Sequence, residues 1–344
     1  MMYCDISLDA AAAVLIDWVN LEASFFGSRE VQRFVMTFGS ETRKIEASYC
    51  LLLIVSFSQS FILVFSTLLM KAGVSSLEQV FFRIIFALPP IFLLARYKAR
   101  LNWRGLMHYV PSGCVFSAFI MSGLSSISLG TAIAVTVGLI YTQPLFTAVL
   151  AALSGREKIG RKHFTIIMIG VIGALLVSGI LNERMSNNRL LGIILALSGA
   201  LWYSFYLFLK RGPRMVSNPM QGMFGTLLFA APCTLILGLI LRSITGDPAL
   251  VGFSSLNLQQ LTLLAGLGLI STALPYGTLN HIKTRLVSPT TEGTILLLDP
   301  LFHTVWAMLF FQQFLSYPQF LGFGLIITSA ALMMKIGVQR RSLD

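Results

Sequence analysis

The chain has 344 residues, of which 56% are apolar and only 11% are charged. A soluble protein of this length carries about 25% charged residues, so the composition excludes a soluble enzyme, a DNA-binding protein and a disordered scaffold. A polytopic membrane protein remains, because one crossing takes roughly 20 apolar residues and ten crossings would use about 200. The net charge of +11 needs a separate explanation, which depends on where the basic residues lie.

The first 46 residues differ from the rest of the chain. They carry seven acidic residues, and their longest apolar run, residues 10–16, is too short to span a membrane. We predict that residues 1–46 form a cytoplasmic N-terminal extension. A second interpretation is that residues 1–35 are an upstream misreading of the start and that translation begins at Met36.

Ten apolar stretches of spanning length follow, and short connections join them. Most contain at least about 18 nearly uncharged residues, which is typical of a membrane-spanning helix. The fold class that we predict is therefore an all-α integral membrane protein with ten transmembrane helices. These helices are expected at residues 48–70, 77–95, 107–124, 130–152, 164–181, 190–209, 220–241, 258–280, 289–311 and 318–336.

The basic residues gather in alternate connections and in the C-terminal tail. If the N-terminus is cytoplasmic, most of the 25 Lys and Arg residues lie on the cytoplasmic side, including the groups at 96–104, 156–162 and 210–214. The positive-inside rule then predicts a multi-pass protein of the cell membrane with both termini, including the tail at 337–344, in the cytoplasm. Topology explains the net charge in this way, so no nucleic-acid partner is expected.

The chain contains an internal repeat. A shift of 156 residues lays the sequence Gln-Pro-Leu-Phe at 143–146 on Asp-Pro-Leu-Phe at 299–302, and indicates two five-helix units at 48–181 and 190–336. Because five is odd, the second unit must cross the membrane in the opposite sense. The connection after the fourth helix agrees, since it holds four basic residues in the first unit and none at 311–317 in the second. The alternative is a chance match between leucine-rich helices. Such inverted repeats are typical of secondary transporters, which hold substrate near the midplane.

In each unit the fourth helix carries a proline, and a glycine-rich helix follows. The first unit has Tyr141-Thr142-Gln143-Pro144, then Gly155-Arg156-Glu157, Gly170 and Gly173; the second has Leu298-Asp299-Pro300, then Gly322 and Gly324. This pattern resembles the drug/metabolite transporter superfamily, and specifically permeases with two EamA repeats, over residues 48–336. The chain departs from the family pattern at Gln313, where a glutamate is usual. The resemblance implies transport of small organic metabolites, often the export of amino acids or related compounds.

Asp299 is the leading candidate for a functional residue. It lies about ten residues into its predicted helix, roughly 15 Å deep, and an ionisable residue at that depth is a functional hypothesis by default. Pro300 removes a backbone N–H and breaks the helix locally, and Gln143-Pro144 supplies the matching face in the first unit. We predict that Asp299 takes up a coupling proton or contacts a cationic group, while Gln143 orients substrate and Pro144 and Pro300 are structural. A purely structural carboxylate is the alternative for Asp299.

Two further charged residues lie inside predicted helices. Glu292 stands seven residues before Asp299 on the same helix face, where it could assist coupling. It also follows Ser288-Pro289 at a helix start, so capping is the favoured interpretation. Arg83 lies roughly 9 Å inside its helix, and it either snorkels outward, pairs with a carboxylate of the ninth helix or binds an anionic substrate.

Aromatic residues supply a candidate substrate lining. Tyr141 and Tyr276 lie mid-helix beside polar residues, so we predict that they orient substrate, and Trp202 is a further candidate. Anchoring at the membrane interface is the alternative for aromatic residues near helix ends. The full aromatic set is Tyr141, Trp202, Tyr203, Tyr206 and Tyr276.

The sequence has no enzyme signature, no metal-ligand spacing among its four histidines and no phosphate-binding glycine loop. We therefore expect neither catalysis nor a cofactor or metal. The expected partners are the lipid bilayer, a small-molecule substrate and protons as a coupling ion, and a homodimer remains open. Two alternatives are kept: a nucleotide-sugar or phosphate-ester antiporter, which would need several cationic groups in its cavity, and a membrane-embedded enzyme or receptor.

Overall fold

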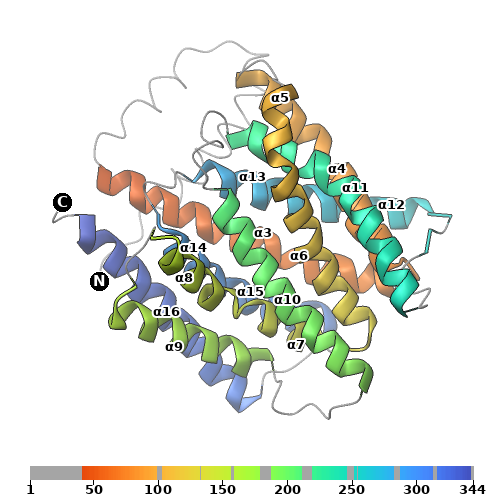
Figure 1. Ribbon diagram of the computed structural model, residues 1–344. Helices are drawn as coiled ribbons and strands as arrows, with labels where there is room; N and C mark the ends of the chain where they lie inside the picture. The colour runs from red at the N-terminus through yellow and green to blue at the C-terminus, as the bar shows by residue number, and fades with distance from the viewer. Residues whose placement is uncertain are drawn as a thin grey trace.

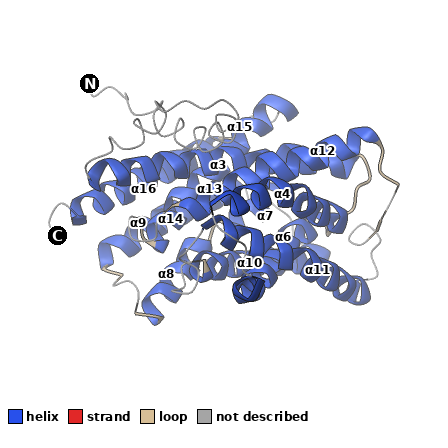
Figure 2. Ribbon diagram, turned by 90° about the horizontal axis from the view of Figure 1, so that it is seen from above, coloured by secondary structure: helices blue, strands red, loops and turns tan. Residues whose placement is uncertain are grey.

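The structure is a computed structural model of the chain. It describes residues 41–98, 103–131, 133–155, 159–178, 187–210, 219–245, 252–253, 255–282, 287–312 and 316–341. Residues 1–40 of the predicted N-terminal extension and residues 342–344 of the tail lie outside this part. Within the described residues every regular element is helical and no strand occurs (Figure 2). The all-α fold that the composition predicts is thereby confirmed.

The first half of the chain consists of two long helices, two interrupted segments and a shorter helix. In a bilayer a helix satisfies its backbone hydrogen bonds within itself, which is why apolar stretches of this length form helices. The elements are α3 (Glu41–Lys71), α4 (Ser76–Lys98), α5 (Trp103–Leu106) leading through a 3₁₀ turn into α6 (Val110–Ser128), α7 (Ile133–Ile140), α8 (Gln143–Leu153) and α9 (Arg161–Ser178).

The second half follows the same order of long, interrupted and terminal helices. Its third segment contains a π-helical turn, η4 (Leu269–Ala273), between two α-helical parts, and its fourth contains a 3₁₀ turn, η5 (Leu296–Leu298). The elements are α10 (Asn187–Leu209), α11 (Pro219–Thr245), α12 (Leu258–Gly268), α13 (Leu274–His281), α14 (Pro289–Ile295), α15 (Asp299–Phe311) and α16 (Tyr317–Arg341).

Nine helical segments of the described chain are long and apolar enough to cross a membrane. They match nine of the ten predicted stretches and support a multi-pass membrane protein. The stretch without a counterpart is 164–181, which contributes to α9. This helix has 18 residues and begins with Arg161 and Lys162, which leaves a shorter apolar segment than a crossing normally takes. The tenth crossing therefore stays a prediction.

The packing of the helices pairs one half of the chain with the other. Helix α9 lies against α16, α4 against α11, and α6 against α10 and α11, while α3 contacts α13 and α15 (Figure 1). By their order in each half, α3, α4, α6 and α9 correspond to α10, α11, α13 and α16. When each helix is replaced by its counterpart, the α6–α10 contact becomes the α13–α3 contact, and the α4–α11 and α9–α16 contacts become themselves. This exchange is what two equivalent five-helix units would give. The opposite orientation of the second unit stays a prediction.

Glycines set the closest helix approach between α9 and α16. A Cβ atom placed on Gly322 would lie 2.6 Å from the carbonyl oxygen of Gly173 and 2.9 Å from the backbone nitrogen of Val177. Backbone atoms cannot rotate away as a side chain can. The two helices therefore keep this separation only while position 322 has no side chain.

We expect Gly322→Ala to lower the melting temperature of the purified protein in detergent. The added methyl forces α9 and α16 apart, which typically costs about 1–3 kcal/mol. Gly324→Ala is the matched control, because a Cβ at that position meets no atom within 4 Å. Equal melting temperatures for the two variants, measured by thermal unfolding, would contradict this account of the interface.

Candidate functional site

Two interrupted helices bring backbone breaks together with polar side chains. Helix α7 ends at Ile140, and α8 begins at Gln143 with Pro144 in its first turn. The corresponding segment of the second half runs from α14 through η5 to α15, which begins with Asp299 and Pro300. A proline lacks the N–H that would continue the preceding helix, so both interruptions fall where the sequence predicts a local break.

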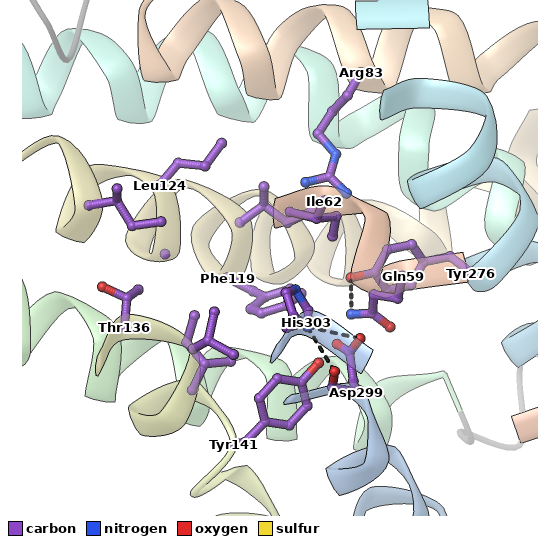
Figure 3. A pocket seen from close by; sticks show the side chains of 15 residues that line it. Gln59, Ile62, Arg83, Phe119, Leu124, Thr136, Tyr141, Tyr276, Asp299 and His303 are labelled. Atoms are coloured by element: carbon purple, nitrogen blue, oxygen red, sulfur yellow. Dashed lines mark hydrogen bonds and ion pairs between the residues drawn. The ribbon is translucent and has the colours of Figure 1, made fainter. Parts of the chain in front are cut away.

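A cavity of about 80 Å³ lies beside these interruptions, between helices of both halves of the chain. Its lining is mostly apolar, with a small group of polar residues (Figure 3). Of the residues predicted from the sequence, Arg83, Tyr141, Tyr276 and Asp299 line it. The polar lining residues are Gln59, Arg83, Thr136, Tyr141, Tyr276, Asp299 and His303.

Asp299 presents a carboxylate to the cavity, and within the described residues neither of its oxygens accepts a well-aligned hydrogen bond. The residue is 1% exposed. The Nδ1 atom of His303 donates to the backbone carbonyl oxygen of Asp299 at 2.9 Å and lies 3.2 Å from the carboxylate oxygen Oδ1. A buried carboxylate normally has hydrogen-bond partners, because burial without them is costly. The site is therefore suited to a proton or a cationic group of a ligand.

Arg83 enters the cavity from α4, on the opposite side from Asp299 (Figure 3). It is 1% exposed, so the snorkelling considered above does not occur in this structure. Its Nε atom donates to Thr272 Oγ1 at 2.9 Å, and its Nη2 atom donates to the carbonyl oxygen of Ser271 at 3.1 Å. Both acceptors belong to the π-helical turn η4, and π-helical turns often occur at functional sites. No carboxylate of the described residues pairs with this guanidinium.

An aromatic cluster lies against the cavity, and two of its members, Phe119 and Tyr276, line it. Tyr276 receives a hydrogen bond from Gln59 at 3.2 Å, and its ring meets the ring of Phe116 edge-on at 4.8 Å. Tyr203 stacks on Phe119 with the ring centroids 4.4 Å apart. We call the buried set Phe116, Phe119, Tyr203, Tyr206 and Tyr276 the aromatic layer. Of its three tyrosines only Tyr276 lines the cavity, while Tyr203 and Tyr206 are buried behind it.

Two of the predicted substrate-binding residues lie outside the cavity lining. Gln143 is buried, and its Nε2 atom donates to the carbonyl oxygen of Gly293 at 3.2 Å, which ties α8 to α14. Trp202 is half-buried on α10, with its ring 6.1 Å from that of Phe205. Both positions argue for a structural contribution rather than direct contact with a ligand in this cavity.

Glu292 forms a buried ion pair that the sequence did not indicate. Its Oε1 atom lies 2.5 Å from the ammonium of Lys210, which also donates to the carbonyl oxygen of Leu279 at 2.9 Å. The two charged side chains are 0% and 4% exposed. Lys210 belongs to the basic group that the sequence predicts on the cytoplasmic side, and in the structure it also connects the ends of α10 and α13 to α14.

Sequence reasoning also passed over two residues of the cavity. His303 stands four residues after Asp299, so the helical period places both on one face, and this spacing was the available signal. Gln59 is an amide in the middle of the apolar helix α3, and a buried amide in such a helix needs a partner from another helix. Both residues lie in the cavity lining.

The nine apolar helices, the interrupted segments and the buried charges define a polytopic membrane protein with an internal polar cavity. The model of the EamA-like transporter family matches residues 47–179 and 190–335. The chain therefore belongs to the EamA-like transporter family, within the drug/metabolite transporter superfamily, and this membership implies a transporter rather than an enzyme.

Comparison with solved structures supports the fold. One solved structure, described only as "Crystal structure of protein", superimposes with a TM-score of 0.60 at 15% sequence identity, over 83% of this chain and 96% of that chain. A likeness at this identity concerns the fold alone. A search of curated proteins finds no match.

Proposed function

We propose that the protein is a secondary transporter that exports small zwitterionic, amino-acid-like metabolites across the cell membrane by alternating access. The observation that carries this proposal is a cavity with a guanidinium from Arg83 on one side and the carboxylate of Asp299, beside His303, on the other. A planar guanidinium suits the carboxylate of an amino acid, and an aspartate suits its ammonium. Tyr141 and Tyr276 lie between apolar lining residues, where they would orient the substrate.

Protons are the proposed coupling ion, with Asp299 as the site of exchange. A carboxylate that binds either a proton or an ammonium group makes the two ligands competitors, which is a simple means of coupling. The other titratable or charged groups that line the cavity are His303, beside Asp299 on α15, and Arg83 on α4, Tyr141 after α7 and Tyr276 on α13. Glu292 is assigned instead to the ion pair with Lys210.

The Lys210–Glu292 pair supports alternating access because it ties helices together on one face of the bundle. That face holds the ends of α10 and α13 and the start of α14. In the proposed orientation, with both termini in the cytoplasm, this is the cytoplasmic face. A shift of 139 residues places Lys210 on Lys71, and the repeat shift of 156 residues places Glu292 on Thr136. These equivalent positions belong to the opposite face. Thr136 has no charge and lines the cavity, so the same ion pair cannot form there.

An antiporter of nucleotide sugars or phosphate esters is less compatible with this cavity. Several negative charges on such a substrate call for several cationic groups. The described lining offers one arginine, no lysine, and a histidine that lies against an aspartate.

Transport by purified protein in proteoliposomes tests the proposal directly. A labelled neutral amino acid is offered with three competitors: the unlabelled amino acid, the amine that lacks its carboxyl group and the acid that lacks its amino group. We expect only the zwitterion to compete well. Equal competition by the amine or the acid would contradict the two-ended site.

The same assay tests Arg83 through the variant Arg83→Lys. Lysine keeps the positive charge but loses the planar fork, so we expect KM to rise roughly tenfold or more, the equivalent of losing about 1.5–3 kcal/mol of charge-assisted hydrogen bonding. Arg96→Lys on the same helix is the matched control, since Arg96 is exposed and outside the cavity. An unchanged KM for Arg83→Lys would remove Arg83 from the binding site.

A further inference from the structure

Two cysteines from different family repeats meet at the interface of α6 and α11. The Sγ atoms of Cys114 on α6 and Cys233 on α11 lie 2.7 Å apart. This separation is longer than a disulfide bond and shorter than an ordinary contact between two thiols. Both residues are free thiols of intermediate exposure within membrane-spanning segments, and neither lines the cavity described above.

The backbones of α6 and α11 are close at this point because Gly113 allows it. A Cβ on Gly113 would lie 2.8 Å from the Cβ of Phe229, 2.8 Å from the carbonyl oxygen of Thr226 and 2.9 Å from the nitrogen of Ala230. Any larger residue would push the helices apart. The cysteine that follows Gly113 therefore reaches the facing helix over a short distance, as a disulfide requires.

Hydrogen bonds fix the register on both sides of the thiols. Thr226 donates to Ser112 at 3.0 Å on one side, and Ser117 and Thr234 share a hydrogen bond of 2.7 Å on the other. The two helices therefore cannot slide or rotate at the cysteines without breaking these bonds. The thiols are held facing each other.

We propose that Cys114 and Cys233 are a redox modification site, at which a peroxide converts the two thiols into a disulfide that links the two repeats. One thiol reacts with hydrogen peroxide to give a sulfenic acid and one molecule of water. The sulfur of the second thiol then displaces a second water from the sulfenic sulfur, and the S–S bond forms. The two sulfurs lose two electrons and two hydrogens, and the peroxide is reduced to two molecules of water.

The link restrains the transporter because α6 and α11 belong to different repeats. Helix α6 also carries Phe119 and Ile120, which line the cavity. Under the proposed alternating access, on which this step rests, the two repeats move relative to each other. A covalent bond at this interface therefore slows transport until the disulfide is reduced.

Peptide mapping of the reconstituted full-length protein tests the modification without reference to transport. The protein carries Cys4→Ser and Cys50→Ser, so that only the pair remains, and is treated with hydrogen peroxide and then denatured in an alkylating reagent. We expect a loss of two hydrogens in mass, one linked peptide containing both cysteines, and reversal by dithiothreitol. Recovery of both thiols as alkylated cysteines, or as separate sulfinic acids, would overturn the proposal.

Transport is then compared before and after peroxide in the same preparation. We expect the rate to fall when the disulfide forms and to recover on reduction, while the further variant Cys233→Ser is insensitive to peroxide. A disulfide that forms without any change in rate would overturn the restraint. An absence of transport in the reduced protein would count against the proposed function and leave the chemical test of the disulfide intact.

Discussion

Asp299→Asn is expected to abolish proton-gradient-dependent transport while leaving the protein folded. Asparagine has nearly the same shape as aspartate, so the start of α15 and the cavity keep their form. It can neither take up a proton nor attract an ammonium group as a charge. Transport of a zwitterion should fall roughly 10- to 100-fold, which corresponds to losing a hydrogen bond to a charged group worth about 1.5–3 kcal/mol.

The absence of a well-aligned hydrogen bond to either carboxylate oxygen, within the described residues, makes this prediction sharper than mid-membrane depth alone would. A structural carboxylate would hold hydrogen bonds from neighbouring helices, and its replacement would act mainly on stability. The nearest titratable side chain, His303, donates a hydrogen bond to the backbone carbonyl of Asp299 and lies 3.2 Å from the carboxylate. Asparagine keeps that backbone hydrogen bond, so we expect the start of α15 to stay folded.

The measurement is uptake into proteoliposomes at several pH values, with and without an imposed pH gradient. The wild-type rate should vary with pH and gradient, whereas the Asp299→Asn rate should be low and flat. Thr304→Val is the matched control, because Thr304 lies on the same helix outside the cavity and its hydroxyl only donates to Pro300 within that helix. Full activity and full gradient dependence in Asp299→Asn would eliminate Asp299 as the coupling site.

The helices and the interrupted segments were predictable from sequence because their causes are local. Spanning length and apolar composition located nine segments, and Pro144 and Pro300 marked the breaks in α7–α8 and α14–α15. The exception was α9, whose basic start shortens its apolar part. The burial of Arg83 and Asp299 was predictable because a charged side chain at mid-membrane depth generally faces protein rather than lipid. Both residues line one cavity.

The remaining site depended on contacts between distant parts of the chain. Lys210 stands at the end of a helix beside other basic residues, where a sequence pattern indicates topology, and only the packing of α10 against α14 shows that it meets Glu292. The position of Trp202 outside the cavity lining was unpredictable for a related reason. Whether a residue of α10 faces the cavity depends on the rotation of that helix, and a helix that is apolar on all sides carries no periodic signal for it.

Removing either member of the Lys210–Glu292 pair is expected to have a large effect on both stability and gating. In Lys210→Met the carboxylate at 0% exposure loses the ammonium beside it, and in Glu292→Gln the ammonium loses the carboxylate. Breaking a buried pair in this way typically costs about 3–5 kcal/mol. The double variant Lys210→Met with Glu292→Gln removes both charges and should cost much less than the sum of the two single changes.

The consequence for gating follows from where the pair lies. It joins the ends of α10 and α13 to the start of α14, so its loss loosens one face of the bundle, while the interface of α9 with α16 is untouched. A cysteine introduced at Ile120 in the cavity reports this, since a membrane-impermeant thiol reagent can be applied to either side of oriented proteoliposomes. The reporter is built in a background with the four native cysteines replaced by serine.

We expect the single variants to make the reporter reactive from the face that the pair holds closed, and the double variant to lie closer to wild type. Lys71→Met, at the equivalent position of the first repeat, is the matched control and should leave this reactivity unchanged. Unaltered accessibility in both single variants, despite a measured loss of stability, would show that the pair only stabilises the fold. The aromatic layer would then be the candidate for closing this face of the cavity. The expected pattern, increased accessibility in the single variants and recovery in the double variant, would show that an uncompensated buried charge opens this face. The lost hydrogen bonds of Lys210 to Glu292 and Leu279 could not explain it, because the double variant restores neither of them.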